Sequence, residues 1–257
     1  MRQAFALCLV VCATLMNGTA AAPLATVPVL IELFTAEGCS SCPPADVLLE
    51  KMIEAQPAGG AEIVGLGQHV DYWDHTGWRD RFSSAAMTER QRLYAARLRV
   101  PSIYTPEMVV DGRTEFVGTD IAAAQRAIER AIAAPHGVVG ITLDTPGVNK
   151  IGVSVTVSGL PAISAGDRAD IIVAVTEDRL RTEVKRGENL GRTLSHAAVV
   201  REMRTIGEAT GGGATARTAI KIASEWRQEN LKVVAFVQER TSRHVLATAA
   251  VLLDRSR

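Results

Sequence analysis

The feature that most constrains this chain is a pair of cysteines placed between a strand pattern and a helix pattern. Residues 29–34 form a short, mostly apolar run, which is typical of a strand buried in a parallel or mixed sheet. The motif Cys39-Ser40-Ser41-Cys42 follows, and two prolines then open a segment with apolar residues at helical spacing over residues 43–53. A CxxC motif alone is only suggestive, but at the junction of a strand and a helix it predicts redox chemistry.

This placement suits thiol–disulfide exchange. The first turn of a helix has N–H groups without intrahelical partners and a partial positive charge, and both stabilise a thiolate. The pKa of a cysteine there falls to roughly 3.5–7.5, against about 8.5 for a free thiol. We expect Cys39, which comes earlier in the loop, to be the more exposed thiol and the nucleophile. Cys42 then resolves the mixed disulfide that the first thiol forms.

Two other interpretations of the cysteine pair stay open. An inert structural disulfide would close a very small loop and so would constrain the unfolded chain little. A metal site is the other interpretation, although zinc usually takes four protein ligands and the mature chain has no second cysteine pair. Cu(I), which prefers soft ligands, would be held by Cys39 and Cys42, with His69 or Met108 as an extra ligand. The protein would then be a copper- or ligand-binding module without turnover.

Residues 1–22 have the pattern of a secretory signal peptide. Arg2 precedes an apolar run over residues 4–16, and small residues with an Ala-x-Ala exit follow. Cleavage there removes Cys8 and Cys12 and leaves the CxxC pair as the only cysteines. We therefore expect a periplasmic or secreted protein in an oxidising compartment. No other stretch reaches about 18 uninterrupted apolar residues, so no membrane span is expected after signal removal.

Composition excludes several classes of function. The chain has 28 Lys and Arg against 28 Asp and Glu, so its net charge is 0 and falls to −1 when the signal peptide is removed. A balanced charge argues against broad electrostatic binding of nucleic acid or of an anionic membrane. The 47% of apolar and 22% of charged residues exclude a disordered chain. No zinc motif, Ser-His-Asp signature or dinucleotide fingerprint is convincing, so we expect no cofactor.

The mature chain changes character near residue 136. Before this point the pattern alternates strand and helix in the order β-α-β-α-β-β-α. Strands are expected at 29–34, 62–67, 108–110 and 115–117. Helices are expected at 43–53, from Ser83, Ser84 or Thr88 to residue 100, and at 121–132 with Asp120 as cap. Short strands follow at 138–143, 151–157, 169–176, 194–203, 218–222, 231–238 and 245–253. The sequence therefore predicts an α/β domain over 23–135 and a β-rich, antiparallel sandwich-like domain over 136–257.

The second half carries no chemical motif of its own. Arg192, His196 and Arg201 either form a cluster or line a solvated strand, and we favour the strand because nothing local requires their chemistry. The β-rich half is therefore expected to serve as a docking or dimerising module.

Residues 69–82 form the second informative stretch. Aromatic residues make up 4% of the chain, yet four of them fall here: Tyr72, Trp73, Trp78 and Phe82. The stretch follows the second strand, whose carboxyl end is expected near Cys39. The rings either form a wall over the thiols or only pack the loop down. His69 is most simply a structural histidine, although the ordinary pKa of histidine also suits proton transfer.

With these features the first half resembles the thioredoxin fold. A strand, a CxxC motif at a helix start, a helix and a strand are followed by Thr105-Pro106 and a Met-Val-Val-Asp-Gly hairpin. In that fold a cis-proline faces the CxxC motif, which implies a cis bond before Pro106. The substrate groove would then be formed by Thr105, Pro106, Tyr72 and Trp73.

Some features depart from thioredoxin. The dipeptide between the cysteines is Ser-Ser, and Gly38 rather than tryptophan precedes Cys39. Thioredoxins also carry a buried carboxylate in the first strand that helps proton transfer. Glu32 is the local candidate for that role, but it lies one residue further from Cys39 than the pattern expects. Because strand faces alternate, its side chain is expected to face the other way.

A closer resemblance extends over nearly the whole mature chain. The runs at 32–46, 69–74, 104–113 and 191–196 are similar to an uncharacterised secreted family known as domain of unknown function 1223. That family is placed among thioredoxin-like proteins, which implies a fold but no substrate. Together with the cysteine motif, the resemblance predicts an exported thiol–disulfide oxidoreductase that acts on proteins or small thiols. The expected partner is a thiol- or disulfide-bearing protein of the periplasm.

Overall fold

The computed structural model describes residues 26–55, 60–147 and 149–253 of the 257-residue chain. The expected signal peptide lies outside these residues. In the first half the strands are β1 (Val27–Thr35), β2 (Ala61–His69), β3 (Glu107–Val110) and β4 (Thr114–Val117), and the helices are α1 (Pro43–Glu54), α2 (Ala85–Leu98) and α3 (Ile121–Ala133). The expected order β-α-β-α-β-β-α is confirmed.

Local sequence explains where the three helices begin. Two prolines occupy the first positions of α1, where a missing N–H breaks no helical bond. The Ser84 side chain accepts a hydrogen bond from Ala86 N and caps α2, and the Asp120 side chain caps α3 in the same way. Of the helices in the described residues, none has both the length and the apolar character needed to cross a membrane.

The second half consists almost entirely of strands: β5 (Val138–Gly147), β6 (Lys150–Ser158), β7 (Ala169–Glu177), β8 (Leu180–Glu183), β9 (Thr193–His196), β10 (Val199–Ala209), β11 (Ala214–Lys221), β12 (Leu231–Glu239) and β13 (Val245–Leu252). A short 3-10 helix, η1 (Gln228–Asn230), precedes β12. The expectation of one strand over 194–203 is wrong, because Ala198 has a positive φ of 50° and separates β9 from β10. Strand β8, which pairs with β9, was not expected from the sequence.

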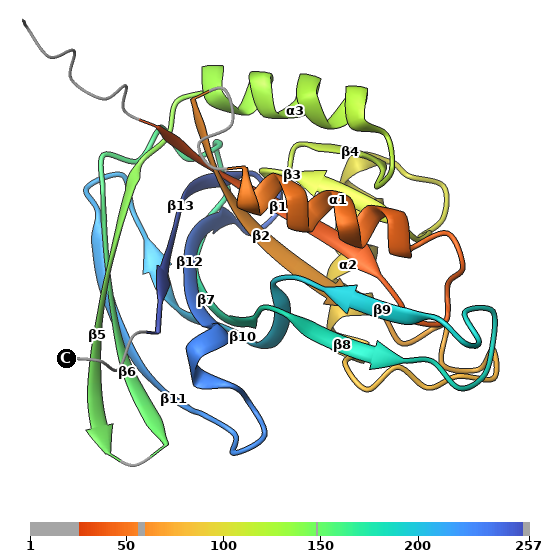
Figure 1. Cartoon of the computed structure of the whole chain (residues 1–257). Coiled ribbons are helices and arrows are strands. Elements are labelled where there is room, and N and C mark those ends of the chain that lie inside the picture. Colours follow the sequence, from red (N-terminus) through yellow and green to blue (C-terminus); the bar gives the residue numbers. More distant parts are fainter. Residues whose placement is uncertain (1–25, 56–59, 148, 254–257) are drawn as a thin grey trace, which may run out of the picture.

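Strands from both halves build one large sheet. Its order is β13-β12-β7-β10-β2-β1-β3-β4 (Figure 1). Strand β1 lies between parallel β2 and antiparallel β3, and β10 of the second half pairs with β2 through Val199 and Gly67. The sheet therefore continues across the expected domain boundary at 135/136, and the division into two domains stays a prediction.

The two faces of β1 have different partners. One face packs under α1 and α3, with Val29, Ile31 and Leu33 in a buried cluster (Figure 1). On the other face Leu30 packs with residues from β7 and β12, among them Ile172 and Phe236. Both faces of β1 are covered, which explains why most residues of this strand are apolar.

A second layer covers the outer side of β7 and β12. The three-stranded antiparallel sheet β11-β6-β5 places Val153 and Val155 in one apolar cluster with Val173 and Val233 (Figure 1). This arrangement corresponds to the sandwich expected for the second half, but one of its two sheets is shared with the first half.

Candidate functional site

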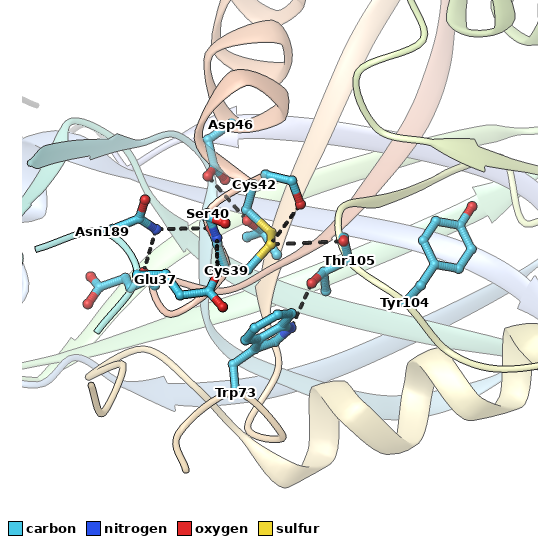
Figure 2. Close-up of a disulfide and its surroundings, with 12 residues drawn as sticks. Glu37, Cys39, Ser40, Cys42, Asp46, Trp73, Tyr104, Thr105 and Asn189 are labelled. Atoms are coloured by element: carbon cyan, nitrogen blue, oxygen red, sulfur yellow. Dashed lines mark hydrogen bonds between the residues drawn. A yellow bond between two sulfur atoms is a disulfide. The ribbon is translucent and has the colours of Figure 1, made fainter. Parts of the chain in front are cut away.

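The two cysteines form a disulfide at the carboxyl end of β1. The bond joins Cys39, in the loop after the strand, to Cys42, which immediately precedes α1 (Figure 2). Their Cα atoms are 5.5 Å apart. Cys42 O accepts hydrogen bonds from Ala45 N at 2.8 Å and Asp46 N at 3.2 Å, so Cys42 belongs to the first helical turn. The expected place of the pair between strand and helix is confirmed.

The exposure expected for Cys39 is wrong. Both cysteines are 0% exposed and pack in one cluster with Phe34, Val70 and Tyr94. The physical reason is that two segments distant in the sequence cover the loop. One is the segment after β2, and the other is the hairpin of β8 and β9, so the CxxC motif alone does not reveal them.

The start of α1 also offers fewer free N–H groups than expected. Pro43 and Pro44 have none, and Cys42 N already donates to Cys39 O at 3.3 Å. The helix dipole therefore remains as the main local source of positive potential. The Ser41 hydroxyl lies 3.4 Å from Cys39 Sγ and is the donor in that contact, because a disulfide sulfur carries no hydrogen.

Thr105 faces the disulfide from the strand side. The Thr105–Pro106 peptide bond is cis, as the thioredoxin resemblance implied, and Pro106 is buried. Thr105 O lies 3.9 Å from Cys39 Sγ, and Trp73 Nε1 donates to Thr105 Oγ1 at 2.7 Å (Figure 2). The structure thus brings Thr105 and Trp73 together beside the cysteines. Tyr72 packs against the same cluster as Trp73, and its hydroxyl reaches Gln91 of α2.

The aromatic residues of the segment after β2 line the disulfide site and also pack this segment against the rest of the fold. Trp73 lies in the cluster around the disulfide. Tyr72 donates its hydroxyl to Gln91 Oε1 of α2 at 3.2 Å, and the Phe82 ring packs on His69 with 5.3 Å between centroids. The two interpretations of these rings are therefore compatible.

A hairpin from the second half closes the opposite side of the loop. We call residues 180–196, which comprise β8, β9 and their connection, the arm. Asn189 of the arm is fully buried, and its Nδ2 donates to Glu37 O and to Cys39 O, each at 2.9 Å. Arg192 Nη1 donates to Asn189 Oδ1 at 3.1 Å. Figure 2 shows Asn189 reaching the loop from the side opposite Thr105.

Glu37 joins the cysteine loop to its surroundings. Its side chain is fully buried, and its backbone N donates to Asp80 Oδ2 at 2.9 Å. Glu37 Oε2 accepts a hydrogen bond from Trp78 Nε1 at 2.7 Å. Glu37 Oε1 lies 3.3 Å from His196 Nε2 of the arm. Neither atom of this last pair has hydrogen-bond geometry with a partner in the described residues.

His69 and His196 lie side by side between the two halves. Their ring centroids are 4.8 Å apart, and both residues are 2% exposed. His69 Nδ1 contacts Asp80 Oδ2 at 2.6 Å, while its Nε2 has no hydrogen-bond partner in the described residues. The expectation that His196 lines a solvated strand is wrong, because β9 carries it under the cysteine loop. Arg201 lies further away, with its guanidinium 5.2 Å from the centroid of the Phe82 ring.

Asp46 is the acidic residue one helical turn after Cys42. Residues four apart share a helix face, and Figure 2 shows Asp46 next to the disulfide. The carboxylate accepts a hydrogen bond from Thr35 Oγ1 at 3.2 Å. Burial raises the pKa of Asp46 to about 7, although nearby His196 opposes the shift. Near neutral pH this carboxyl can therefore give or take a proton beside the cysteines.

Glu32 has a different environment from the one that proton transfer requires. Its carboxylate accepts hydrogen bonds from Arg90 Nε at 2.6 Å and Nη2 at 2.9 Å, and from the Tyr94 hydroxyl. Burial raises the pKa of Glu32, but the charge and hydrogen bonds of Arg90 outweigh it, so the pKa is lowered. The side chain faces α2, whereas Thr35 reaches Asp46 on α1. Glu32 therefore lies on the α2 face of β1, opposite to Ile31 and Leu33 under α1, as the alternation of strand faces predicts.

The extra copper ligands named from the sequence are not assembled with the cysteines. Met108 packs in the core under α1 and α3, and His69 Nδ1 is held by Asp80. Within residues 26–55, 60–147 and 149–253, no group of three or more His, Cys, Asp or Glu side chains is arranged to hold a metal ion.

Three residues of the site were missed by sequence reasoning. Asp46 had a usable signal, because it follows Cys42 at helical spacing. Glu37 is polar and precedes the motif by two residues, but nothing local predicts its burial. Asn189 lies 150 residues after Cys39 and has no local signal.

Comparison with known families supplies an identity for the chain. The family model described as "Protein of unknown function (DUF1223)" matches residues 30–238. The chain belongs to the DUF1223 family. The match includes both the cysteine loop and the arm, so every residue of the candidate site lies within the family region. No protein of curated function matches the chain in sequence.

Two solved structures are similar over most of the DUF1223 chain. The crystal structure of protein AGR_C_4864 from Agrobacterium tumefaciens has 25% sequence identity and a TM-score of 0.70, covering 90% of this chain and 97% of that one. HBP35 of Porphyromonas gingivalis has 16% identity and a TM-score of 0.66, covering 90% and 77% respectively. The second likeness shows the fold alone.

Proposed function

We propose that this DUF1223 protein is an exported thiol–disulfide exchange protein that uses Cys39 and Cys42 on protein or small-thiol substrates. The observation that carries the proposal is the disulfide at the first turn of α1, where the parallel strands β1 and β2 end. Ligands of open α/β sheets bind at that edge. The Thr105 carbonyl opposite Cys39 would offer a hydrogen-bond acceptor to the backbone of a partner.

We further propose that the first half is thioredoxin-like. Support comes from the strand order β2-β1-β3-β4, in which the first pair is parallel and the other two are antiparallel. Helices α1 and α3 share one face of these strands, in a single cluster with β1. The second half then adds strands to the free edge of β2.

The exchange would proceed in two balanced steps. A partner thiolate attacks Cys39 Sγ, a mixed disulfide forms, and Cys42 leaves as a thiolate. A second partner thiolate then attacks the mixed disulfide and leaves Cys39 reduced, so two electrons pass to the protein. In the reverse sequence the Cys39 thiolate attacks a partner disulfide and Cys42 resolves the mixed disulfide, so the partner is reduced to a dithiol and the protein disulfide forms again.

In this scheme Asp46 carries the proton for Cys42. The leaving thiolate is buried, where an uncompensated charge is unfavourable. Because the pKa of Asp46 is raised to about 7, its carboxyl is often protonated at neutral pH and can neutralise that thiolate. We therefore assign the proton-transfer role to Asp46 in place of Glu32.

Trapping of mixed disulfides tests the proposal. In a Cys42→Ser variant, Cys39 lacks its resolving thiol, so adducts with partner proteins should accumulate in a bacterial periplasm and disappear on reduction. The double variant Cys39→Ser, Cys42→Ser is the matched control. Absence of adducts above this control would contradict exchange.

Sequencing of the exported protein's N-terminus tests the expected cleavage after residue 21 or 22.

An inert disulfide is the second candidate, and the full burial of both cysteines favours it. The redox potential separates the two candidates, since structural disulfides have potentials below about −300 mV. The remaining alternative is a copper-binding module, and a Cu(I) titration of the reduced protein tests it. A copper carrier should bind Cu(I) tightly and lose this binding when either cysteine is substituted.

A further inference from the structure

The tip of the arm, residues 187–191, holds the backbone of the cysteine loop. The Asn189 side chain donates to the carbonyl oxygens of Glu37 and Cys39, each at 2.9 Å. The neighbouring Glu188 side chain accepts a hydrogen bond from Ser40 N at 3.1 Å. Peptide groups on both sides of Cys39 are therefore bound to one short segment of the second half.

The loop is pressed against its other cover as well. A Cβ atom added at Gly38 would lie 3.0 Å from Thr76 Oγ1 and 3.2 Å from Trp73 O. The loop thus lies between the segment after β2 and the tip of the arm, which explains why Cys39 is fully buried. Because Cys39 is 0% exposed, a thiol can reach its Sγ only after part of the surrounding structure moves.

The tip is mostly exposed, with Asn189 as its one buried residue. Its ends, Gly187 and Gly191, both have positive φ, at 75° and 79°. Leu190 is 66% exposed, so much of the tip faces solvent. The base of the arm is fixed by contrast, because Val184 is 1% and Leu194 is 4% exposed. Movement of the tip would leave these buried contacts intact.

We propose that Asn189 is a positioning residue for disulfide exchange. While the tip is closed, its two hydrogen bonds hold the cysteine loop and keep Cys39 enclosed. When those bonds break, the tip lifts and a thiol gains access to Cys39 Sγ. This inference rests on the proposed exchange function for its biological meaning, but the accessibility of the disulfide is a separate physical property.

The rate of reduction by excess dithiothreitol tests the inference. The reagent gives up two electrons and two protons as it cyclises, and the protein gains two thiols. Asn189→Ala and Asn189→Asp both remove the donors, and each should raise the rate about tenfold at low denaturant, as expected for the loss of two hydrogen bonds. Glu188→Ala, at a fully exposed side chain, should raise the rate about threefold. Leu190→Ala, on the same tip, is the matched control and should leave it unchanged.

Urea separates opening of the tip from a general loss of stability. If the tip controls access, reduction at low urea has almost no urea dependence, because little surface is exposed when the tip lifts. The Asn189 variants then react faster without a matching change in the free energy of global unfolding. Wild-type rates in folded Asn189 and Glu188 variants, or acceleration explained by global unfolding, would overturn the inference.

These outcomes are distinguishable from failure of the proposed function. Faster reduction of the Asn189 variants, with no adducts trapped by Cys42→Ser, would leave the tip as a cover over a disulfide that does not exchange with proteins. Trapped adducts together with unchanged reduction rates would support exchange, but they would show that Asn189 does not control access to the disulfide.

Discussion

Asp46 keeps its proton at pH values where most aspartates have lost theirs. Its pKa rises from 3.8 to about 7, chiefly because the side chain is buried. The unfolded chain therefore releases this proton first as pH rises, and the folded protein loses stability between about pH 4 and pH 7. We expect Asp46→Asn to remove this loss, on the order of 2–4 kcal/mol at pH 8. Thermal unfolding of the wild type and the variant at pH 4 and pH 8 measures this effect. If the variant differed from the wild type by the same amount at both pH values, the account of Asp46 would be contradicted.

The same substitution separates stability from proton transfer. Asparagine accepts the hydrogen bond from Thr35 but cannot protonate the Cys42 thiolate. Reduction by dithiothreitol at neutral pH should slow about tenfold or more in Asp46→Asn, although the variant is more stable. A rate equal to that of the wild type across the pH range would exclude Asp46 from the reaction.

Glu32 and Arg90 form an ion pair that is almost entirely buried. Their side chains are 1% and 8% exposed. Glu32→Gln leaves the guanidinium buried without a counter-charge, and we expect a loss of about 3–5 kcal/mol in the free energy of unfolding at neutral pH. Because the pKa of Glu32 is lowered, the pair's contribution is also lost as pH falls below about 4.5.

Urea unfolding measures this loss, with the exposed pair of Glu89 and Arg92 on α2 as control. Their side chains are 61% and 59% exposed, so Glu89→Gln should change stability by less than about 0.5 kcal/mol. Similar effects in the two variants would show that burial does not govern the Glu32 pair.

At the scale of elements, the turn between β3 and β4 leaves no room for a side chain at Gly112. Gly112 has φ of 63°, and an added Cβ would lie only 1.8 Å from Arg243 O in the turn between β12 and β13. Gly112→Ala should therefore cost about 3–5 kcal/mol. Gly211→Ala is the control, since nothing lies within 4 Å of its added Cβ. Equal losses in urea unfolding would contradict this account of the turn.

The elements that the sequence predicts well are those with strong local signals. Strand β1 has a mostly apolar run, and α3 has both a capping aspartate and apolar residues at helical spacing. Strand β8 has four residues with only one of them buried, so its pattern is too short to detect. The join of β9 and β10 has no glycine or proline, and Ala198, which has the positive φ, donates its N–H to Asp178 of a distant segment.

At the scale of the whole molecule, the site is assembled from segments that no local pattern connects. The CxxC motif predicted the disulfide and its place before a helix. Asn189, which bonds to Cys39 O, lies 150 residues further along the chain, and the raised pKa of Asp46 comes from burial rather than from residue type. Tertiary packing thus decides the properties that matter for reactivity, namely access and pKa, whereas the sequence indicates the reacting atoms.

The shared sheet should make the two halves unfold together. Leu30 and Val64 of the first half pack in one cluster with Val234 and Phe236 of the second. The strand pairing between the halves passes through Gly67, where an added Cβ would lie 2.8 Å from Ala197 O. Calorimetry should therefore give one transition, with equal calorimetric and van't Hoff enthalpies. Gly67→Ala should cost about 1–3 kcal/mol and lower the midpoint of the single transition by about 2–4 °C per kcal/mol. Two transitions, of which Gly67→Ala moves only one, would mean that residues 26–135 and 136–253 are independent domains despite their common sheet.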